Sequence, residues 1–563
     1  MSDPALAAVQ RWTLRAAAFA LPLVYSPLTY DGYVLPKLLV ARAVVIVLLA
    51  LQAFRVLSTR RLAVRRTPLD LAWLVFLASA VLSTVLAGNA NVAIFGTYGR
   101  YDGLLTFLTY AALFWLSVQV IRDRTEARTV LRVLLAGGYA CAAIAIFQSV
   151  HDSLQSGSLA PAFGTLGNPN VLGGYLAMVL ALAVGEAIEA RLPGARVLAV
   201  NAIVLVGLAL LLTLSRSAWI ASVVGVLVVV LARGPLRVRV AIIGSAAVAI
   251  ALIVFAAGAI GNGPELEQRV AARVLALNDP GSSRFGIWTN SMTLIASRPI
   301  TGFGPDNVGL VFPQFQTGDW GLAAGHIRQP IDKTHAEVLQ VAATQGMIGL
   351  AAYLFLLAAF LRMFWSGRRM EFAIPIFAGW LAYELALQAN FTALASALPF
   401  WIFAGAAIVM FDKSTGEKVV ERANRVVPWT VIPVLVAAFA AGVVVPFLAD
   451  ANLKAAVDDD LAGQTAAAAQ PATLAARLAP YDGVEATEVG NIAFEQGHWA
   501  AAREAYREAA RLGTFNPLVY RNLALADQRL GLLGEARTAA EKAVFLDPYD
   551  PANQALLAQF GSQ

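Results

Sequence analysis

Five charged or titratable residues stand in short polar stretches that interrupt an otherwise apolar sequence: Arg100, Arg216, Arg284, Lys333 and His335. The stretches around them are rich in glycine, proline and asparagine, which are typical of turns. An arginine at a membrane boundary either binds an anion or extends its side chain to water, and a neutral histidine can accept the proton of a hydroxyl group. These residues therefore suit anion binding and general-base chemistry. Interfacial anchoring of the arginines and a solvated histidine are the alternative interpretation.

The rest of the chain is too apolar for a water-soluble protein. Of its 563 residues 58% are hydrophobic and only 14% are charged, and the mean hydropathy is +0.66, whereas an ordinary soluble domain has roughly 25% charged residues. Apolar runs of about 17 to 23 residues match the length of a helix that crosses a bilayer. The sequence predicts thirteen membrane-spanning helices, at residues 14–30, 38–57, 69–88, 104–121, 130–150, 171–189, 197–213, 217–232, 238–260, 343–361, 372–390, 393–411 and 427–449.

Lysine and arginine are concentrated in alternate loops, and this asymmetry predicts the orientation in the membrane. Most of them lie in one set of loops, at residues 55–66, 122–128, 191–196, 233–239, 362–369 and 413–418. We therefore expect a multi-pass protein of the cytoplasmic (inner) membrane, with its N-terminus inside and its C-terminal domain outside. The net charge of +6 arises mainly from these loops and does not indicate a nucleic-acid partner. Cys141, the lone cysteine, lies in an apolar span and supports no metal site.

Two segments break the pattern of short loops. Residues 261–342 are polar and long but contain Trp288, Phe303 and Trp320, and disordered segments tend to lack such aromatic residues. Because connections of this length are uncommon unless they are functional or disordered, we expect an ordered, functional extracytoplasmic loop. The sequence thus predicts a transmembrane domain over residues 1–449 and a second domain over residues 450–563.

The second domain repeats with a period of 34 residues. Equivalent positions in three copies are occupied by glycine, alanine or leucine: Gly463, Gly497 and Gly531; Ala468, Ala502 and Ala536; Ala475, Ala509 and Ala543; and Leu478, Leu512 and Leu546. Small residues at such positions let paired helices pack closely. The pattern resembles the tetratricopeptide repeat and predicts an array of helical hairpins, which offers a surface for a protein partner.

Five polar stretches, in the same order along the chain and on the predicted outer side, carry a resemblance to a known family. They are residues 167–176, 283–288, 298–307, 332–340 and 346–349. Together they resemble the O-antigen ligase and polymerase superfamily, in its form with C-terminal tetratricopeptide repeats, over about residues 70–410. One position departs from the family pattern, because Ala336 follows His335 where asparagine is common.

The resemblance implies an all-α membrane core like that of the GT-C-type glycosyltransferases, and an inverting, metal-independent glycosyl transfer that needs no cofactor. The implied donor is a glycan on polyprenyl (undecaprenyl) diphosphate, and the acceptor is a hydroxyl of a glycan, lipid or protein, as in lipopolysaccharide and other cell-surface polysaccharide biosynthesis. His335 is then the candidate catalytic base. Arg216 and Arg284 are candidates for binding the diphosphate, because a guanidinium group contacts phosphate oxygens at two points. Arg100 and Lys333 are weaker candidates for the same role.

Other functions stay open on the sequence. Within the superfamily they are ligation to a lipid A core, polymerisation of repeat units and O-linked protein glycosylation. A transporter or lipid flippase would fit the number of spans, but Arg42 and Glu384 are among the few ionisable residues deep in the spans, and the halves show no internal symmetry. A scaffold that acted only through its repeats would need one span. Residues 302–305, Gly-Phe-Gly-Pro, lack the features of a phosphate-binding loop, so no nucleotide site is expected.

Overall fold

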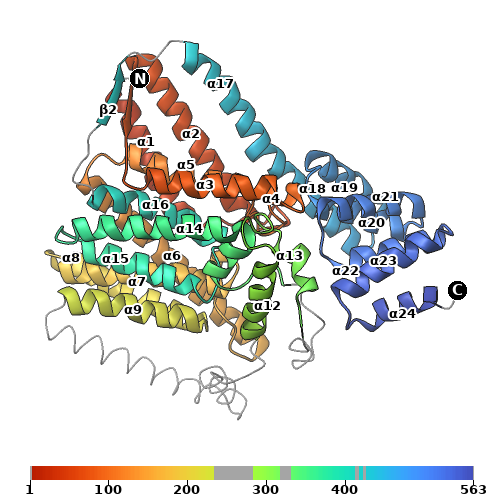
Figure 1. The fold of residues 1–563 in the computed structure, drawn as a ribbon. Coiled ribbons are helices and arrows are strands. Elements are labelled where there is room, and N and C mark those ends of the chain that lie inside the picture. Colours follow the sequence, from red (N-terminus) through yellow and green to blue (C-terminus); the bar gives the residue numbers. More distant parts are fainter. Residues whose placement is uncertain (1–2, 234–282, 318–330, 412–416, 422–425, 562–563) are drawn as a thin grey trace.

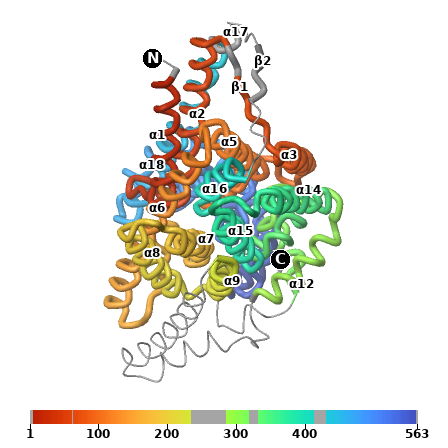
Figure 2. Tube along the Cα trace, turned by 90° about the vertical axis from the view of Figure 1, so that its left-hand side faces the viewer, coloured from red at the N-terminus to blue at the C-terminus, as the bar shows by residue number. Residues whose placement is uncertain are grey.

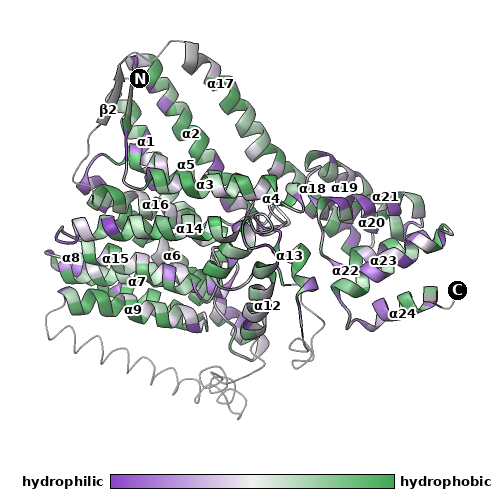
Figure 3. Cartoon of the chain, in the orientation of Figure 1, coloured by the Kyte–Doolittle hydropathy of each residue, from purple (hydrophilic) through white to green (hydrophobic). Residues whose placement is uncertain are grey.

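The computed structural model describes residues 3–233, 283–317, 331–411, 417–421 and 426–561, which are almost entirely helical (Figure 1). By length and composition, eight described helices are apolar enough to cross a membrane: Leu35–Thr59, Arg124–Ser156, Pro169–Glu189, Pro193–Leu212, Arg216–Arg233, Glu337–Gly367, Leu394–Phe411 and Thr430–Leu461. Three shorter apolar helices accompany them: Asp70–Val85, Leu104–Val120 and Ala373–Leu387. Figure 3 shows apolar residues covering these elements and a more hydrophilic surface on the repeat helices.

The membrane domain is a bundle whose central helices are almost completely enclosed. In the apolar stretch of α7 89% of the residues are buried, and in that of α16 94% are. In the peripheral helix Thr430–Leu461 only 11% are buried. Figure 2 shows α7, α15 and α16 surrounded by the others. The elements are α1 (Asp3–Ala20), α2 (Leu35–Thr59), α3 (Asp70–Val85), α4 (Ala90–Phe95), α5 (Leu104–Val120), α6 (Arg124–Ser156), η1 (Gly164–Leu166), α7 (Pro169–Glu189), α8 (Pro193–Leu212), α9 (Arg216–Arg233), α14 (Glu337–Gly367), α15 (Ala373–Leu387), α16 (Leu394–Phe411), α17 (Val426–Phe439) and the π-helical turn η4 (Ala440–Val444).

The predicted spans agree with apolar helices of the structure at eleven positions, and one differs. The span predicted at 14–30 is wrong, because α1 ends at Ala20 and a loop follows. Pro22 and Pro27 lie in this segment, and proline cannot continue a helix in its interior. The span predicted at 238–260 lies outside the described residues.

Two short strands depart from the all-helical pattern. β1 (Arg61–Arg65) pairs antiparallel with β2 (Glu417–Glu421), with Arg61 opposite Glu421 and Arg65 opposite Glu417. They belong to two loops that the charge pattern predicts on the same face of the membrane. Their pairing agrees with that prediction.

The long predicted loop contains ordered helical elements: α12 (Ser283–Ser297), α13 (Val308–Val311) and η3 (Phe312–Gln314). Within this loop, residues 261–282 and 318–330 lie outside the described part. The loop ends at Ala336, because α14 begins at Glu337 and not near residue 343 as predicted. The helix is kinked at Gly346, whose φ of 67° and ψ of −166° are not helical, so a short helical segment precedes the part that crosses the membrane.

The C-terminal repeats are three helical hairpins and a final helix: α18 (Val445–Leu461) with α19 (Thr465–Leu478), α20 (Gly483–Glu495) with α21 (Trp499–Leu512), α22 (Pro517–Arg529) with α23 (Leu533–Leu546), and α24 (Pro551–Gly561). Gly463, Gly497 and Gly531 stand at the equivalent turn of each hairpin, with φ of 74°, 74° and 75°. Glycine adopts this left-handed conformation without strain, which explains the 34-residue glycine spacing. α18 continues directly from α17 and η4, so the last membrane helix is also the first repeat helix.

Candidate functional site

His335 lies in a turn whose position is fixed by the buried ion pairs of Lys333. The Lys333 ammonium lies 2.7 Å from Asp102 and 2.8 Å from Asp306, and its side chain is 2% exposed. Asp306 also accepts hydrogen bonds from the backbone N–H and the hydroxyl of Thr97, at 2.6 and 2.9 Å. The turn before α14 is therefore tied to the loop of residues 96–103 and to the segment after α12.

Further contacts hold the backbone on either side of His335. The Thr334 N–H donates to the Gln340 side chain at 2.9 Å, and the Trp288 indole N–H donates to the His335 carbonyl at 3.3 Å. The imidazole meets the Phe391 ring edge to face, with ring centres 5.3 Å apart. The ring is thus held in place while the side chain remains half-buried.

Backbone strain is concentrated around this turn. Among the described residues, six that are not glycine have positive φ, and four of them flank the candidate site: Tyr101 (52°), Leu214 (53°), Asp306 (56°) and His335 (54°). Asparagine, aspartate and histidine adopt this conformation more often than other residues with a side chain, so the strain is greatest at Tyr101 and Leu214. Strained residues persist only where surrounding contacts enforce them, and they are often found at functional sites.

The electrostatic environment keeps His335 neutral. Burial, together with the positive charge of Arg284, lowers the pKa of His335 to about 4, while Asp332 acts in the opposite direction. A histidine with a pKa of about 4 is unprotonated at neutral pH. It can therefore accept a proton without first losing one.

Arg284 connects the other predicted residues. It lies in the first turn of α12, and its pKa is lowered by burial and by the nearby charge of Arg216. Because Arg284 also acts on His335, it is within electrostatic range of both residues. The fold thus brings together three segments that are far apart in the sequence.

Arg216 follows a tight turn between α8 and α9. The turn contains Leu214, with positive φ, and Ser215, whose hydroxyl donates to Asn170 at 2.8 Å. Asn170 stands at the start of α7, where the Asn168 side chain caps the helix by accepting from the Asn170 and Val171 N–H groups. The predicted stretch 167–170 therefore supports the arginine turn.

Arg100 and Lys333 already have carboxylate partners. The Arg100 guanidinium lies 2.5 Å from Asp332 and 5.2 Å from the centre of the Phe391 ring. Burial opposes the charge of Arg100, but Asp332 outweighs it and raises the pKa of the guanidinium. Burial likewise opposes the charge of Lys333, whereas Asp102 and Asp306 raise its pKa. Both cations therefore remain charged, and their charge is balanced within the protein.

Several residues of the site were not among the predicted ones: Asp102, Asp306, Asp332, Trp288 and Phe391. The three acids stand in polar stretches that the sequence analysis selected for their arginine, lysine or histidine. The sequence did contain a signal for these acids, because a buried lysine or arginine in an apolar protein requires a carboxylate partner. Which acid pairs with which base depends on the fold.

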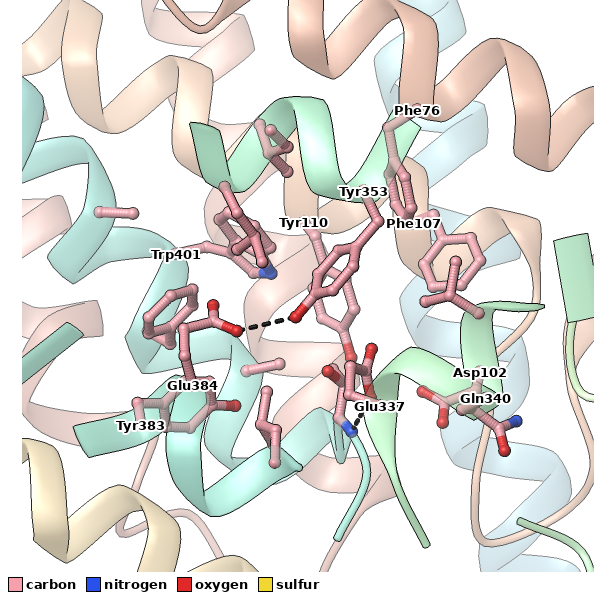
Figure 4. Close-up of a pocket in the computed structure, with 18 of the residues that line it drawn as sticks. Phe76, Asp102, Phe107, Tyr110, Glu337, Gln340, Tyr353, Tyr383, Glu384 and Trp401 are labelled. Atoms are coloured by element: carbon pink, nitrogen blue, oxygen red, sulfur yellow. Dashed lines mark hydrogen bonds between the residues drawn. The ribbon is translucent and has the colours of Figure 1, made fainter. Parts of the chain in front are cut away.

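A cavity of about 90 Å³ extends from the Lys333 cluster into the membrane domain. Figure 4 shows Asp102, Glu337 and Gln340 at one end and Glu384 among aromatic side chains at the other. The Tyr353 hydroxyl donates to Glu384 at 2.8 Å, and Glu337 accepts from the Thr392 N–H at 2.7 Å. The cavity is large enough to hold several water molecules beside these polar groups.

Residues 201–354 match the family model described as O-antigen ligase. This part of the chain is similar to an O-antigen ligase domain. The matched range contains Arg216, Arg284, Lys333 and His335, whereas Arg100 precedes it. Together with the eight apolar helices, the match supports a multi-pass membrane protein with a function in cell-surface glycan assembly.

Comparisons with curated proteins and with solved structures give no further support for a function. Comparison with curated proteins finds no match. Among solved structures, the crystal structure of the APC/C hetero-tetramer Cut9-Hcn1 aligns over 92% of this chain and 83% of that chain, with 12% identity and a TM-score of 0.19.

Proposed function

We propose that the O-antigen ligase domain transfers a glycan from polyprenyl diphosphate to an acceptor hydroxyl, with inversion at the anomeric carbon. His335 takes the proton of the hydroxyl as its oxygen bonds to the anomeric carbon. The bond from that carbon to the diphosphate breaks, and the polyprenyl diphosphate leaves with the electron pair. A positioned general base contributes typically about 10²- to 10⁴-fold to such a step.

The observation that carries this proposal is the position of Arg284, within electrostatic range of both Arg216 and His335. Burial is the main cause of the lowered pKa of Arg284, and repulsion by the positive charge of Arg216 adds to it. A diphosphate bound between them would remove the repulsion and accept several charge-assisted hydrogen bonds. The leaving group is acidic, so it needs charge neutralisation more than a proton.

Arg100 and Lys333 have a different role in the proposal. Because both are paired with carboxylates, we assign them to positioning the His335 turn and not to the diphosphate. Their sequence-based assignment as diphosphate ligands stays a weaker alternative. No metal or cofactor is part of the proposed reaction, since the lipid diphosphate is already an activated donor.

We place the site at the outer face of the cytoplasmic membrane. In support, the loops that contain the candidate residues and their supporting contacts are all predicted on that face: residues 96–103, 167–170, 213–216, 283–317 and 331–336. The paired strands β1 and β2 come from two loops predicted on the opposite face. This orientation gives the site access to a lipid-linked glycan in the outer leaflet.

Transfer by the full-length protein in liposomes, with a glycan on undecaprenyl diphosphate as donor, tests the proposal. His335→Ala and Arg284→Ala should each reduce product formation at least about 100-fold, while Arg284→Lys should restore only part of it because lysine cannot bind two oxygens at once. His151, an exposed histidine of α6, provides the matched control as His151→Ala. Normal transfer by the His335 and Arg284 variants would reject the mechanism.

The same assay separates the acceptor classes. A ligase moves the glycan onto a lipid, a polymerase increases glycan length, and a protein transferase increases the mass of a protein. A transporter or flippase would move the donor across the bilayer without changing its covalent structure.

A further inference from the structure

A second cavity, of about 460 Å³, lies on the other side of the loop of residues 96–103. Its walls are apolar and come from α2, α5 and the peripheral helix that joins α17 to α18, with Leu38, Leu108, Ala112, Ala438 and Ala441 among the lining residues. The repeat domain closes one end through Tyr481, Asp482 and Glu485. The cavity therefore has the form of an apolar groove with a polar end at the repeat domain.

The polar end contains hydrogen-bonding groups that lack partners. One carboxylate oxygen of Glu485 and the hydroxyl of Tyr101 have no hydrogen-bond partner among the described residues, although these residues are only 3% and 9% exposed. A buried polar group that stays without a hydrogen bond destabilises the folded protein. Both residues line the cavity, so hydroxyl groups of a bound molecule would lie beside them.

The same end is rich in carboxyl groups. Asp450 accepts from the Tyr98 hydroxyl and, at 3.1 Å, from the Asp31 N–H. Burial raises the pKa of Asp482 to about 6, and burial together with the charge of Asp482 raises the pKa of Glu485 well above its ordinary value. With a pKa of about 6, Asp482 is mostly ionised at neutral pH and disfavours a bound phosphate. Carboxyl groups in either protonation state form hydrogen bonds with hydroxyl groups.

Arg42 is the cation that lines this cavity, and it lies along the apolar part of the wall. It donates to the Gly442 carbonyl of the π-helical turn at 3.4 Å. Its charge acts on Tyr481 and Tyr101. Arg42 thus offsets part of the negative charge without converting the polar end into an anion site.

The loop of residues 96–103 separates this cavity from the candidate catalytic site. Arg100 and Asp102 pair with residues of the His335 turn, whereas Tyr98 and Tyr101 line the second cavity. Phe95, at the start of the loop, stacks on Tyr481 with ring centres 4.2 Å apart. A molecule bound in the cavity would contact the loop that also contacts the His335 turn.

We propose that this cavity binds an uncharged glycolipid, with its acyl chain in the apolar groove and its hydroxyl-rich head group against Tyr101 and Glu485. The repeat domain then forms part of a lipid site. That this lipid is the acceptor rests on the proposed function, whereas its binding does not. The diphosphate donor is excluded here and goes to Arg216 and Arg284.

Binding to the full-length protein in phosphatidylcholine nanodiscs tests the proposal, with fluorescent monoglucosyl diacylglycerol as probe and fluorescent phosphatidylglycerol as the anionic comparison. Ala441→Trp fills the groove and should weaken glucosyl-lipid binding at least about tenfold. Tyr101→Phe removes one hydroxyl and should weaken it about fivefold, the equivalent of one hydrogen bond. Val436→Trp, on the exposed face of α17, should leave it unchanged.

Equal affinity for the glucosyl and anionic lipids, or unchanged glucosyl-lipid binding in both Ala441→Trp and Tyr101→Phe, would overturn the proposal. Thermal unfolding of each variant shows whether it is folded, and Tyr101→Phe preserves the size of the side chain. Arg284→Ala should retain glucosyl-lipid binding. If the lipid binds as expected but the wild type transfers no glycan, the proposed function fails and the lipid site stands.

Discussion

The Lys333 ammonium lies 2.8 Å from the Asp306 carboxylate, and these side chains are 2% and 1% exposed. Asp102 completes the cluster at 2.7 Å from the same ammonium. Burial raises the pKa of Asp102, whereas Lys333 holds the pKa of Asp306 below its ordinary value. Lys333 precedes His335 by two residues, so this cluster determines where the candidate base lies.

Lys333→Met should destabilise the protein by about 3 to 5 kcal/mol, because breaking a buried ion pair leaves an uncompensated charge. Glycan transfer should fall with it, since the His335 turn loses its anchor. The measurement is thermal unfolding in detergent, with Lys454→Met, which removes an exposed ion pair with Asp458, as control. In the double variant with Asp306→Asn the loss should be smaller than the sum of the two single losses. Additive losses would show that the two residues do not interact.

The rate of transfer should stay high in mildly acidic solution. His335 must be unprotonated to act as the base, and its pKa of about 4 places the acid limb of kcat/KM well below the ordinary histidine value of 6.5. A profile that falls to half near pH 6.5 would show that the base is another group or that His335 is exposed. His335→Ala should remove this limb from the residual activity.

The same shift has a consequence for stability. Because the pKa of His335 is lower in the folded state than in the unfolded state, protons favour unfolding. The contribution of His335 to stability is therefore fully present above pH 6.5 and is lost as the pH falls toward 4. Unfolding temperatures of wild type and His335→Ala should converge with decreasing pH over this interval.

Gly346→Ala should disturb the site at the kink of α14, which ends the short helical segment that follows His335. A Cβ atom at Gly346 would lie 2.2 Å from the Ile300 carbonyl oxygen, and φ there is positive. The Phe303 and Gly304 N–H groups donate to the Ala343 and Thr344 carbonyls beside this kink, so the variant should lower both the unfolding temperature and the transfer rate. Gly207→Ala, in α8, meets nothing within 4 Å and should be neutral. Equal stability of the two variants would contradict the role of the kink.

The sequence predicted the fold best where a repeated residue type has a single structural explanation. The glycines spaced by 34 residues share a left-handed turn, and the apolar runs became helices at eleven of the predicted positions. The candidate site could be predicted in part, because His335, Arg216 and Arg284 lie in recognisable polar stretches. Their carboxylate partners could not be assigned, since Asp102 and Asp306 reach Lys333 only through long-range packing. The predicted extent of the first helix was wrong because the apolar run continues past Pro22 and Pro27, whereas α1 ends before these prolines, at Ala20.

The repeat domain should dock on the membrane domain through a small set of contacts around α4. Asn91 donates to the carbonyls of Tyr481 and Leu512 at 2.7 and 3.2 Å, and Phe95 stacks on Tyr481. Asn91→Ala combined with Phe95→Ala should therefore increase amide hydrogen exchange in α20 and α21, while α18 stays protected because it continues the last membrane helix. Leu518→Ala, at an exposed position of α22, is the control. If docking shapes the polar end of the second cavity, the double variant should also weaken binding of the glucosyl lipid. Unchanged exchange in α20 and α21 would mean that other contacts hold the repeat domain.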